Sequence, residues 1–407
     1  MNRVYLDSAA TTPLDKGVLK AMTPYFSKDF GNPGAIHAFG QEAMKAIDQA
    51  REKIIRLLGG SVLEDFRNVI FTGSATEANN LALRGSVKEF YSLKRSDKHL
   101  PVKIIVSAAE HDSILKTAED LEAEGVEVVY LPVDRKGSVD IGKLKSSLDQ
   151  RTVLVSVHYV NNETGVVEDV AEIGKTVEDF RQSLGANEVF PLFHSDAVQA
   201  FQYFDCSPET IKADLITLSG HKMFGPKGTG VLYFNRIVSR RERQAGKIIG
   251  LKPILTGGGQ EFGLRSGTEN VPGIVGFAAA AALADRKRKE SFGKVSGLRD
   301  FFAKGLKAID KEISFNTPLE KSSPHILNVR FPGVSSEEMI GRLDLLGIAA
   351  SAGSACSSRS LMLSRALLAT GMPEKEVSES VRFSFSRDNE KSGLAAGLKA
   401  VKRILGR

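Results

Sequence analysis

The sequence predicts an α/β protein: a large domain with a mostly parallel seven-stranded sheet flanked by helices, joined to a smaller α+β domain. Short apolar, β-branched segments alternate with longer amphipathic segments over the first two-thirds of the 407-residue chain. This alternation is typical of parallel strands that are covered by helices on both faces. After the glycines at 257–259 the order changes, because long helical patterns precede the next apolar segments. A chain of this length suits two or three domains.

Seven segments of the first part have the length and composition of buried strands. They are residues 68–72, 103–107, 127–131, 153–158, 190–195, 215–219 and 231–234. Amphipathic patterns at 75–89, 113–124 and 170–184 predict helices between several of these strands. Strands separated by helices define the α/β class.

The last third of the chain predicts a second domain. Two long helical patterns come first, at 272–292 and 295–309. Strands are then expected at 314–316, 325–330 and 381–384, and helices at 336–346, 360–370 and 390–405. We therefore predict a large domain of residues 14–262 and a small domain of residues 1–13 and 263–407.

Composition and charge exclude several classes of protein. Apolar content of 42% and charged content of 26% are ordinary for a soluble globular protein, and no apolar run of about 18 residues predicts a membrane span. The first residues lack the pattern of a signal peptide, so we expect a cytoplasmic location. The net charge is +6, but basic clusters such as residues 236–243 contain acidic residues and no aromatic run, so no nucleic-acid partner is expected.

The two cysteines, Cys206 and Cys356, exclude a disulfide framework and a paired-cysteine metal site. No pair of histidines has metal-ligand spacing, so we expect no metal. Cys206 is expected to be a buried structural residue. His158 and His194 fall inside predicted strands and are expected to lie in the core.

The strongest local signal is Ser219-Gly220-His221-Lys222, which follows a predicted buried strand and precedes further glycines. A lysine forms a Schiff base when it is partly desolvated or near another cation, because its amine is then neutral often enough to attack a carbonyl. The same pattern also fits a glycine-rich loop with an exposed lysine. The segment alone leaves both interpretations open.

Asp196 favours the first interpretation. It directly follows the strand expected at 190–195, and ligands of open α/β sheets bind at the carboxyl ends of the strands. A carboxylate there can pair with the pyridinium nitrogen of a cofactor and keep it protonated. Gln199 lies close enough along the chain to reach the phenolic oxygen of the same ring. A helix N-cap is the alternative role for Asp196.

Two further segments follow predicted strands. Gly73-Ser74-Ala75-Thr76 begins a helix, and backbone N–H groups at such a position bind anions such as a cofactor phosphate. The same residues also form an ordinary helix cap. His111 follows the strand expected at 103–107, where an imidazole can stack on an aromatic cofactor and relay protons.

The segment 351–360 consists of small residues, one arginine and one thiol, Cys356. With so little apolar surface to bury, such a segment is expected to move easily. Arg359 would lower the pKa of the thiol if it stayed close. Alternatively, the segment is a surface loop with an incidental cysteine. Arg382, on a predicted strand, has the side chain for a bidentate pair with a substrate carboxylate.

Together these motifs resemble the cysteine desulfurases of the NifS/IscS type, which belong to the class-V aminotransferases and have the fold of the type I pyridoxal-phosphate transferases. The resemblance covers nearly the whole chain. It rests on residues 5–12, 31–33 with His37, 72–77, 110–111, 161–165, Asp196 with Gln199, 219–222, 257–261, 265–270 and 353–356.

The resemblance implies a role for each matching residue. Lys222 would hold pyridoxal 5′-phosphate as a Schiff base and move the substrate Cα proton, and Cys356 would attack the substrate sulfur. For the cofactor, Asp196 would hold the pyridine nitrogen, Gln199 would hold the phenolic oxygen, and His111 would stack on the ring. The cofactor phosphate would be bound by Ala75, Thr76, Ser219 and His221, and by Thr268 from the other subunit. Asn162 and Arg382 would orient the substrate carboxylate and the cofactor.

The implied function is that of a homodimeric cysteine desulfurase. It would convert L-cysteine into L-alanine and a persulfide on Cys356, for transfer to an acceptor or scaffold protein in iron–sulfur cluster assembly or tRNA thiolation. A selenocysteine lyase or another class-V enzyme is the alternative activity. A sulfur-relay scaffold or binding protein without chemistry is the non-enzymatic alternative, which the intact Lys222, Asp196 and His111 disfavour.

Overall fold

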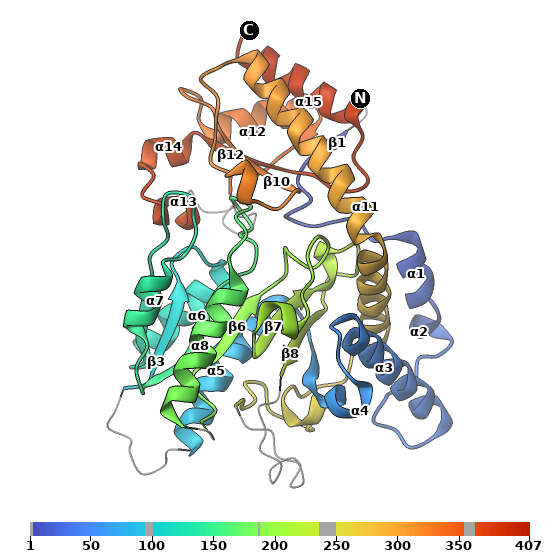
Figure 1. Ribbon diagram of the computed structural model, residues 1–407. Coiled ribbons are helices and arrows are strands. Elements are labelled where there is room, and N and C mark those ends of the chain that lie inside the picture. Colours follow the sequence, from blue (N-terminus) through green and yellow to red (C-terminus); the bar gives the residue numbers. More distant parts are fainter. Residues whose placement is uncertain (1–2, 94–100, 186–187, 236–249, 354–362) are drawn as a thin grey trace.

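The computed structural model describes residues 3–93, 101–185, 188–235, 250–353 and 363–407 (Figure 1). Cys356, Arg359 and the basic cluster at 236–243 lie outside the described residues. Figure 1 shows a larger part built around a sheet and a smaller part that holds both ends of the chain. None of the described helices is both long and apolar enough to cross a membrane.

The central sheet has seven strands in the spatial order β2-β8-β7-β6-β5-β3-β4. The strands are β2 (Val69–Thr72), β3 (Lys103–Ser107), β4 (Glu127–Leu131), β5 (Thr152–Ser156), β6 (Leu192–Asp196), β7 (Leu215–Ser219) and β8 (Gly230–Phe234). Neighbours are parallel except that β8 is antiparallel to both β2 and β7. The predicted mostly parallel seven-stranded sheet is confirmed, with shifts of one or two residues at some strand ends.

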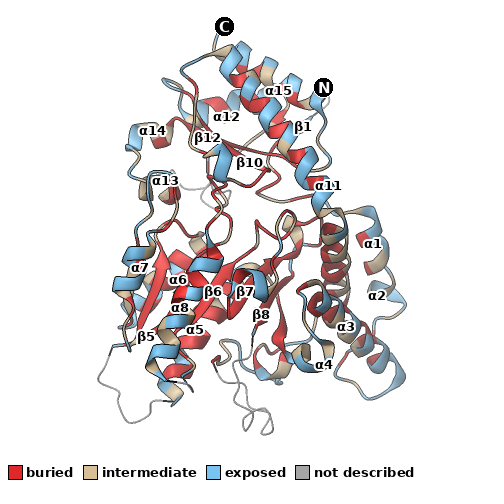
Figure 2. Ribbon diagram, viewed as in Figure 1, coloured by how far each residue is buried: buried red, intermediate tan, exposed pale blue. Residues whose placement is uncertain are grey.

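Helices cover both faces of this sheet, and Figure 2 shows buried strands beneath helices whose outer faces are exposed. Successive side chains of a strand point to opposite faces, so Ile104 and Val106 of β3 lie in one apolar core and Ile105 in the other. The first core contains α5 (Ala75–Leu93) and α6 (Asp112–Ala123), and the second contains α3 (Ala38–Leu57), α7 (Ile141–Ser147) and α8 (Val170–Leu184). Shorter helices are α1 (Lys16–Met22), α2 (Pro24–Ser27), α4 (Val62–Asp65) and α9 (Pro208–Ile211).

The smaller part has its own apolar core, which includes Leu6, Phe302 and Phe383. Its antiparallel sheet has the order β12-β10-β9, with β9 (Ser314–Phe315), β10 (Ile326–Arg330) and β12 (Ser380–Ser384). The N-terminal strand β1 (Val4–Tyr5) pairs in parallel with β11 (Ile348–Ala349). The helices are α12 (Ser336–Leu345), α13 (Arg365–Ala369), α14 (Glu374–Ser378) and α15 (Lys391–Ile404). Of the helix expected at 360–370, the described residues show α13, which begins at Arg365 and is capped by Ser364.

The two helices expected at 272–292 and 295–309 are one continuous helix, α11 (Val271–Ile309). Gly293 stands where the break was expected, but a glycine inside a helix costs only about 1 kcal/mol relative to alanine. Packing at both ends offsets that cost, since residues 271–284 lie in the core beside α3 and residues 295–306 lie in the core of the smaller part. Because α11 contributes residues to both cores, it does not mark a boundary between two domains. The division of the chain at residue 262 stays a prediction.

Candidate active site

A cavity of about 490 Å³ lies at the carboxyl ends of the central strands. This position follows from the fold, because parallel strands present the loops after their carboxyl ends at the same edge. The predicted site residues that line the cavity are Ala75, Thr76, His111, Asn162, Asp196, Gln199, Ser219, His221, Lys222 and Arg382. Thr268 is not among the lining residues and is exposed in the segment before α11. Cys356 lies outside the described residues.

Lys222 reaches the cavity from a short 3₁₀ turn, Gly220–Lys222, that directly follows β7. Its Nζ donates hydrogen bonds to the main-chain oxygens of Ala9 (2.6 Å) and Ala10 (2.8 Å). The turn requires glycine at 220, since a Cβ there would lie 2.8 Å from the Thr229 hydroxyl and 2.9 Å from a main-chain oxygen. The N-terminal segment therefore fixes the position of the lysine amine, a contact that the sequence did not predict.

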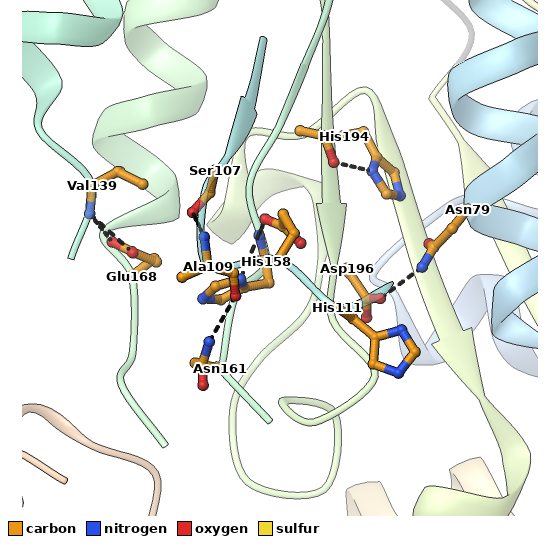
Figure 3. A network of polar contacts seen from close by, with 12 residues as sticks. Asn79, Ser107, Ala109, His111, Val139, His158, Asn161, Glu168, His194 and Asp196 are labelled. Atoms are coloured by element: carbon orange, nitrogen blue, oxygen red, sulfur yellow. Dashed lines mark hydrogen bonds and ion pairs between the residues drawn. The ribbon is translucent and has the colours of Figure 1, made fainter. Parts of the chain in front are cut away.

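Asp196, the last residue of β6, is buried and has two N–H donors. Its Oδ2 accepts a hydrogen bond from Asn79 Nδ2 (2.8 Å) and its Oδ1 from the backbone N–H of Val198 (3.0 Å). Figure 3 shows Asn79 directed at this carboxylate and His111 beside it. Two donors stabilise negative charge on a buried carboxylate, which suits the partner of a pyridinium nitrogen.

The first turn of α5 forms the wall expected to bind an anion. Ser74 and Glu77 form a capping pair, in which the Glu77 N–H donates to Ser74 Oγ (3.1 Å) and the Gly73 N–H donates to Glu77 Oε2 (2.8 Å). Ala75 and Thr76 follow at the cavity. Gly230 of β8 allows this turn to lie close to the sheet, because a Cβ at 230 would be only 2.5 Å from the carbonyl carbon of Ser74. Backbone N–H groups at such a helix start bind phosphate.

His221, which lines the cavity, and His325, which contacts the cavity residue Gln199, have pKa values well below the usual range of histidine. Burial, with the nearby Lys222 and Lys227, lowers the pKa of His221 to about 4. Burial, with Arg382 and Lys222, lowers the pKa of His325 to about 3. His325 Nε2 contacts Gln199 Oε1 at 3.0 Å, and the Gln199 amide donates to Ala9 O at 3.0 Å. Gln199 is thus held in place by His325, a residue that no sequence motif indicated.

Arg382 is almost fully buried in β12. Its Nη1 donates to the main-chain oxygen of Asn162 (2.8 Å) and its Nη2 donates to Asp7 Oδ1 (3.0 Å). Ser351 Oγ also donates to Asp7 (2.8 Å). The Nε of Arg382 is buried and has no hydrogen-bond partner within the described ranges. Arg382 also lines the cavity, and a guanidinium on a cavity wall suits a bound carboxylate.

His194 and His158 were both expected in the core. His194 is fully buried in β6, and its ring nitrogens contact the hydroxyls of Ser156 and Thr217. His158 is different, because it follows the end of β5 and lines the cavity. Its Nδ1 lies 3.2 Å from Glu110 Oε1. Burial alone would lower the pKa of His158, but the carboxylates of Glu110, Glu168 and Asp196 together raise it, and Glu110 has the largest share among them.

Glu168, drawn to the left of His158 in Figure 3, is expected to make the stability of the protein pH-dependent. Burial raises its pKa from 4.5 to about 7. A carboxyl with a raised pKa in the folded state stabilises the protein below pH 4.5, and this contribution is lost as the pH rises through 7. We expect the free energy of unfolding of wild type, relative to Glu168→Gln, to fall by on the order of 3 kcal/mol across this range. Urea denaturation of both proteins at several pH values tests this; a pH-independent difference contradicts it.

The donor set of the cavity fits pyridoxal 5′-phosphate. The aldehyde of the cofactor needs an amine, its pyridine nitrogen a carboxylate and its phosphate several N–H donors. Lys222, Asp196 and the first turn of α5 supply these groups on walls of one cavity. No group of three or more His, Cys, Asp or Glu side chains that could hold a metal occurs within the described part of the chain.

Comparison with known proteins agrees with this assignment. The family model of the class-V aminotransferases matches residues 4–396. The chain belongs to this family, whose enzymes use pyridoxal 5′-phosphate.

The more specific similarity is to cysteine desulfurases. The chain is 40% identical, over the full length of both proteins, to the putative cysteine desulfurase IscS 1 of Bacillus subtilis (strain 168). It is 38% identical to the cysteine desulfurase IscS of Dictyoglomus turgidum, over 99% of this chain and 94% of that protein. A solved structure of a NifS-like protein superposes with a TM-score of 0.86 at 32% identity, covering 99% of each chain.

Proposed function

We propose that this chain is a pyridoxal-phosphate-dependent cysteine desulfurase, which converts L-cysteine into L-alanine and leaves the sulfur as a persulfide on Cys356. The observation that carries the proposal is that Lys222, Asp196, His111 and Arg382 all line one cavity. Full-length similarity to proteins named cysteine desulfurase supports the choice of reaction.

Each wall of the cavity has a separate task. When bound, the cofactor supplies a ring that accepts electrons from the substrate. Lys222 would hold its aldehyde, Asp196 its pyridine nitrogen and Gln199 its phenolic oxygen, while His111 covers the ring. Its phosphate would be held by Ala75, Thr76, Ser219 and His221, and by Thr268 of a second subunit.

The substrate would be oriented by its carboxylate. Asp7 and the main-chain oxygen of Asn162 hold the Arg382 guanidinium at the cavity, where it would pair with an incoming carboxylate. The side chain of Asn162 lies on the same wall. Lys222 would then take the Cα proton.

The sulfur step requires no external oxidant. The Cys356 thiolate attacks the substrate sulfur and forms an S–S bond. The substrate C–S bond breaks, and its electron pair stays with the carbon, which is protonated to give the methyl group of alanine. A thiolate is the nucleophilic form of cysteine.

Dimerisation, location and the sulfur acceptor are further parts of the proposal. We propose a homodimer, because the large apolar side chains of Phe26, Phe30, Ile36 and Phe39 are exposed near one another in sequence and exposed apolar patches mark interaction surfaces. We also propose a cytoplasmic enzyme that passes persulfide sulfur to an acceptor in iron–sulfur cluster assembly or tRNA thiolation. Light scattering of the purified protein tests the dimer; a monomer at micromolar concentration contradicts it.

The test of the activity is incubation with L-cysteine and a reductant, with alanine and sulfide measured. We expect Cys356→Ser to retain the cofactor absorbance and to lose persulfide and sulfide formation. The matched control is Cys206→Ser, which should keep its activity because Cys206 is buried and burial raises the pKa of its thiol. A cofactor-loaded wild-type protein that yields no alanine overturns the proposal.

A further inference from the structure

A continuous chain of hydrogen bonds joins Asp196 to His111 across two helices. Asn79 of α5 is fully buried, and its Nδ2 lies 2.8 Å from Asp196 Oδ2 and 2.8 Å from Ser113 Oγ. Ser113, in the first turn of α6, has its Oγ 2.9 Å from His111 Nδ1. The backbone N–H of Ser113 donates to the same nitrogen at 3.1 Å. The two residues assigned to the ring nitrogen and the ring face of the cofactor are thus connected through Asn79 and Ser113.

The direction of each hydrogen bond in this chain follows from its two ends, the Asp196 carboxylate and the Ser113 N–H that donates to His111. The amide group of Asn79 that faces a carboxylate has to be the NH₂, since its oxygen would be repelled. One of the two hydrogens goes to Asp196 and the other to Ser113 Oγ. The backbone N–H of Ser113 donates to His111 Nδ1, so this nitrogen is an acceptor, and the Ser113 hydroxyl that also faces it donates its own proton there. With two donors directed at it, Nδ1 carries no proton.

We infer that Asn79 is a positioning residue, which acts through the Ser113 hydroxyl to hold the neutral His111 ring with its proton on Nε2 while it also fixes the Asp196 carboxylate. The tautomer of a histidine is set by the hydrogen bond at its other ring nitrogen.

The consequence for catalysis rests on the proposed function. A His111 ring that is held in this form offers an N–H group to whatever is bound in the cavity and has no basic nitrogen to offer. His111 is then a hydrogen-bond donor in the reaction, and removal of the Cα proton is left to Lys222. Substitution of Asn79 should therefore lower kcat with little change in KM.

The experiment is nitrogen-15 NMR of the histidine rings in the purified holoenzyme, without L-cysteine. The variants are Asn79→Leu, Ser113→Ala and the double variant. Asn80→Leu is the matched control because Asn80 is the half-buried neighbour on the same helix, and its side-chain amide donates to the main-chain oxygen of Thr76. The wild-type ring of His111 should be protonated on Nε2. Asn79→Leu and Ser113→Ala should shift the Nδ1 resonance in the same direction, the double variant should shift it no further than Ser113→Ala alone, and Asn80→Leu should leave it unchanged.

Two results overturn the inference: a wild-type His111 with its proton on Nδ1, or an Asn79→Leu variant whose Nδ1 resonance stays at the wild-type position while Ser113→Ala moves it. The first needs no variant, so it decides the question even if Asn79→Leu does not fold. In alanine formation we expect kcat of Asn79→Leu to fall by about tenfold, less than the ~10²–10⁴-fold contribution of a general acid itself. Failure of wild type to make alanine would refute the desulfurase proposal while leaving the NMR result standing.

Discussion

Lys222→Ala is expected to lower the rate of alanine formation from L-cysteine by at least ~10²–10⁴-fold, the usual contribution of one acid–base group. The loss should be larger if the same amine also forms the covalent link to the cofactor. The fold should survive, because the Lys222 ammonium contacts the main-chain oxygens of Ala9 and Ala10 at a cavity wall and is only partly buried. Activity and far-ultraviolet circular dichroism of the purified variant check both parts.

A covalent label identifies the lysine directly. Borohydride reduction of the loaded wild type should attach the cofactor permanently to the peptide that contains Lys222, as mass spectrometry would show. Lys227, in the same glycine-rich loop, is the control: Lys227→Ala should still be labelled at Lys222. The assignment fails if the label is found on another peptide or if Lys222→Ala retains turnover.

The largest effect on stability is expected at the buried pair of Arg51 and Glu261. Two hydrogen bonds of 2.9 and 2.7 Å join their side chains, which are 4% and 2% exposed. Glu261 Oε2 also accepts the backbone N–H of Phe71 at 2.9 Å, and the guanidinium lies 4.7 Å from the ring centre of Phe262. Removing one partner of a buried pair leaves the other charged and unpaired, which costs about 3–5 kcal/mol. We expect Glu261→Gln to lose that much free energy of unfolding.

Glu52, which follows Arg51 in α3, provides the matched comparison. Its ion pair with Arg56 is long, 3.9 Å, and both side chains are exposed, so Glu52→Gln should change stability by less than about 1 kcal/mol. Urea denaturation of the three proteins measures both changes. Equal losses in Glu261→Gln and Glu52→Gln would contradict the assignment of the large effect to burial.

Much of the fold was predictable because local patterns encode it. β7 was placed at its observed bounds, since a short apolar segment followed by glycine and lysine has few other structures available. Asp196 and Ala75 were located at the cavity for a similar reason: the ends of parallel strands meet at one edge. The roles of these residues remain predictions, because the structure shows their positions and not their chemistry.

What the sequence did not reveal depends on contacts between distant segments. The oxygens of Ala9 and Ala10 that hold Lys222 come from more than 200 positions away, and His325 is 126 positions from Gln199. Asn79 carried a weak signal, as a polar residue on the buried face of a predicted helix. The continuity of α11 was missed for another reason, since a glycine inside a helix is tolerated when packing on both sides compensates.

The pairing of the N-terminal segment also governs when the lysine site can form during synthesis. Leu6 exchanges backbone hydrogen bonds with Ala349 and Ser384, and the Ala9 N–H donates to the Ser384 hydroxyl, 375 positions later in the chain. Ala9 is also one of the two residues whose carbonyls hold Lys222, and Ala10 is the other. The ribosome makes the N-terminal segment at the beginning of translation and residues 349 and 384 near the end. The central sheet can therefore assemble before the N-terminal segment is fixed in place beside the Lys222 amine. Closing a loop of this length is slow, and we expect cofactor capture to be among the last steps in the maturation of the nascent protein.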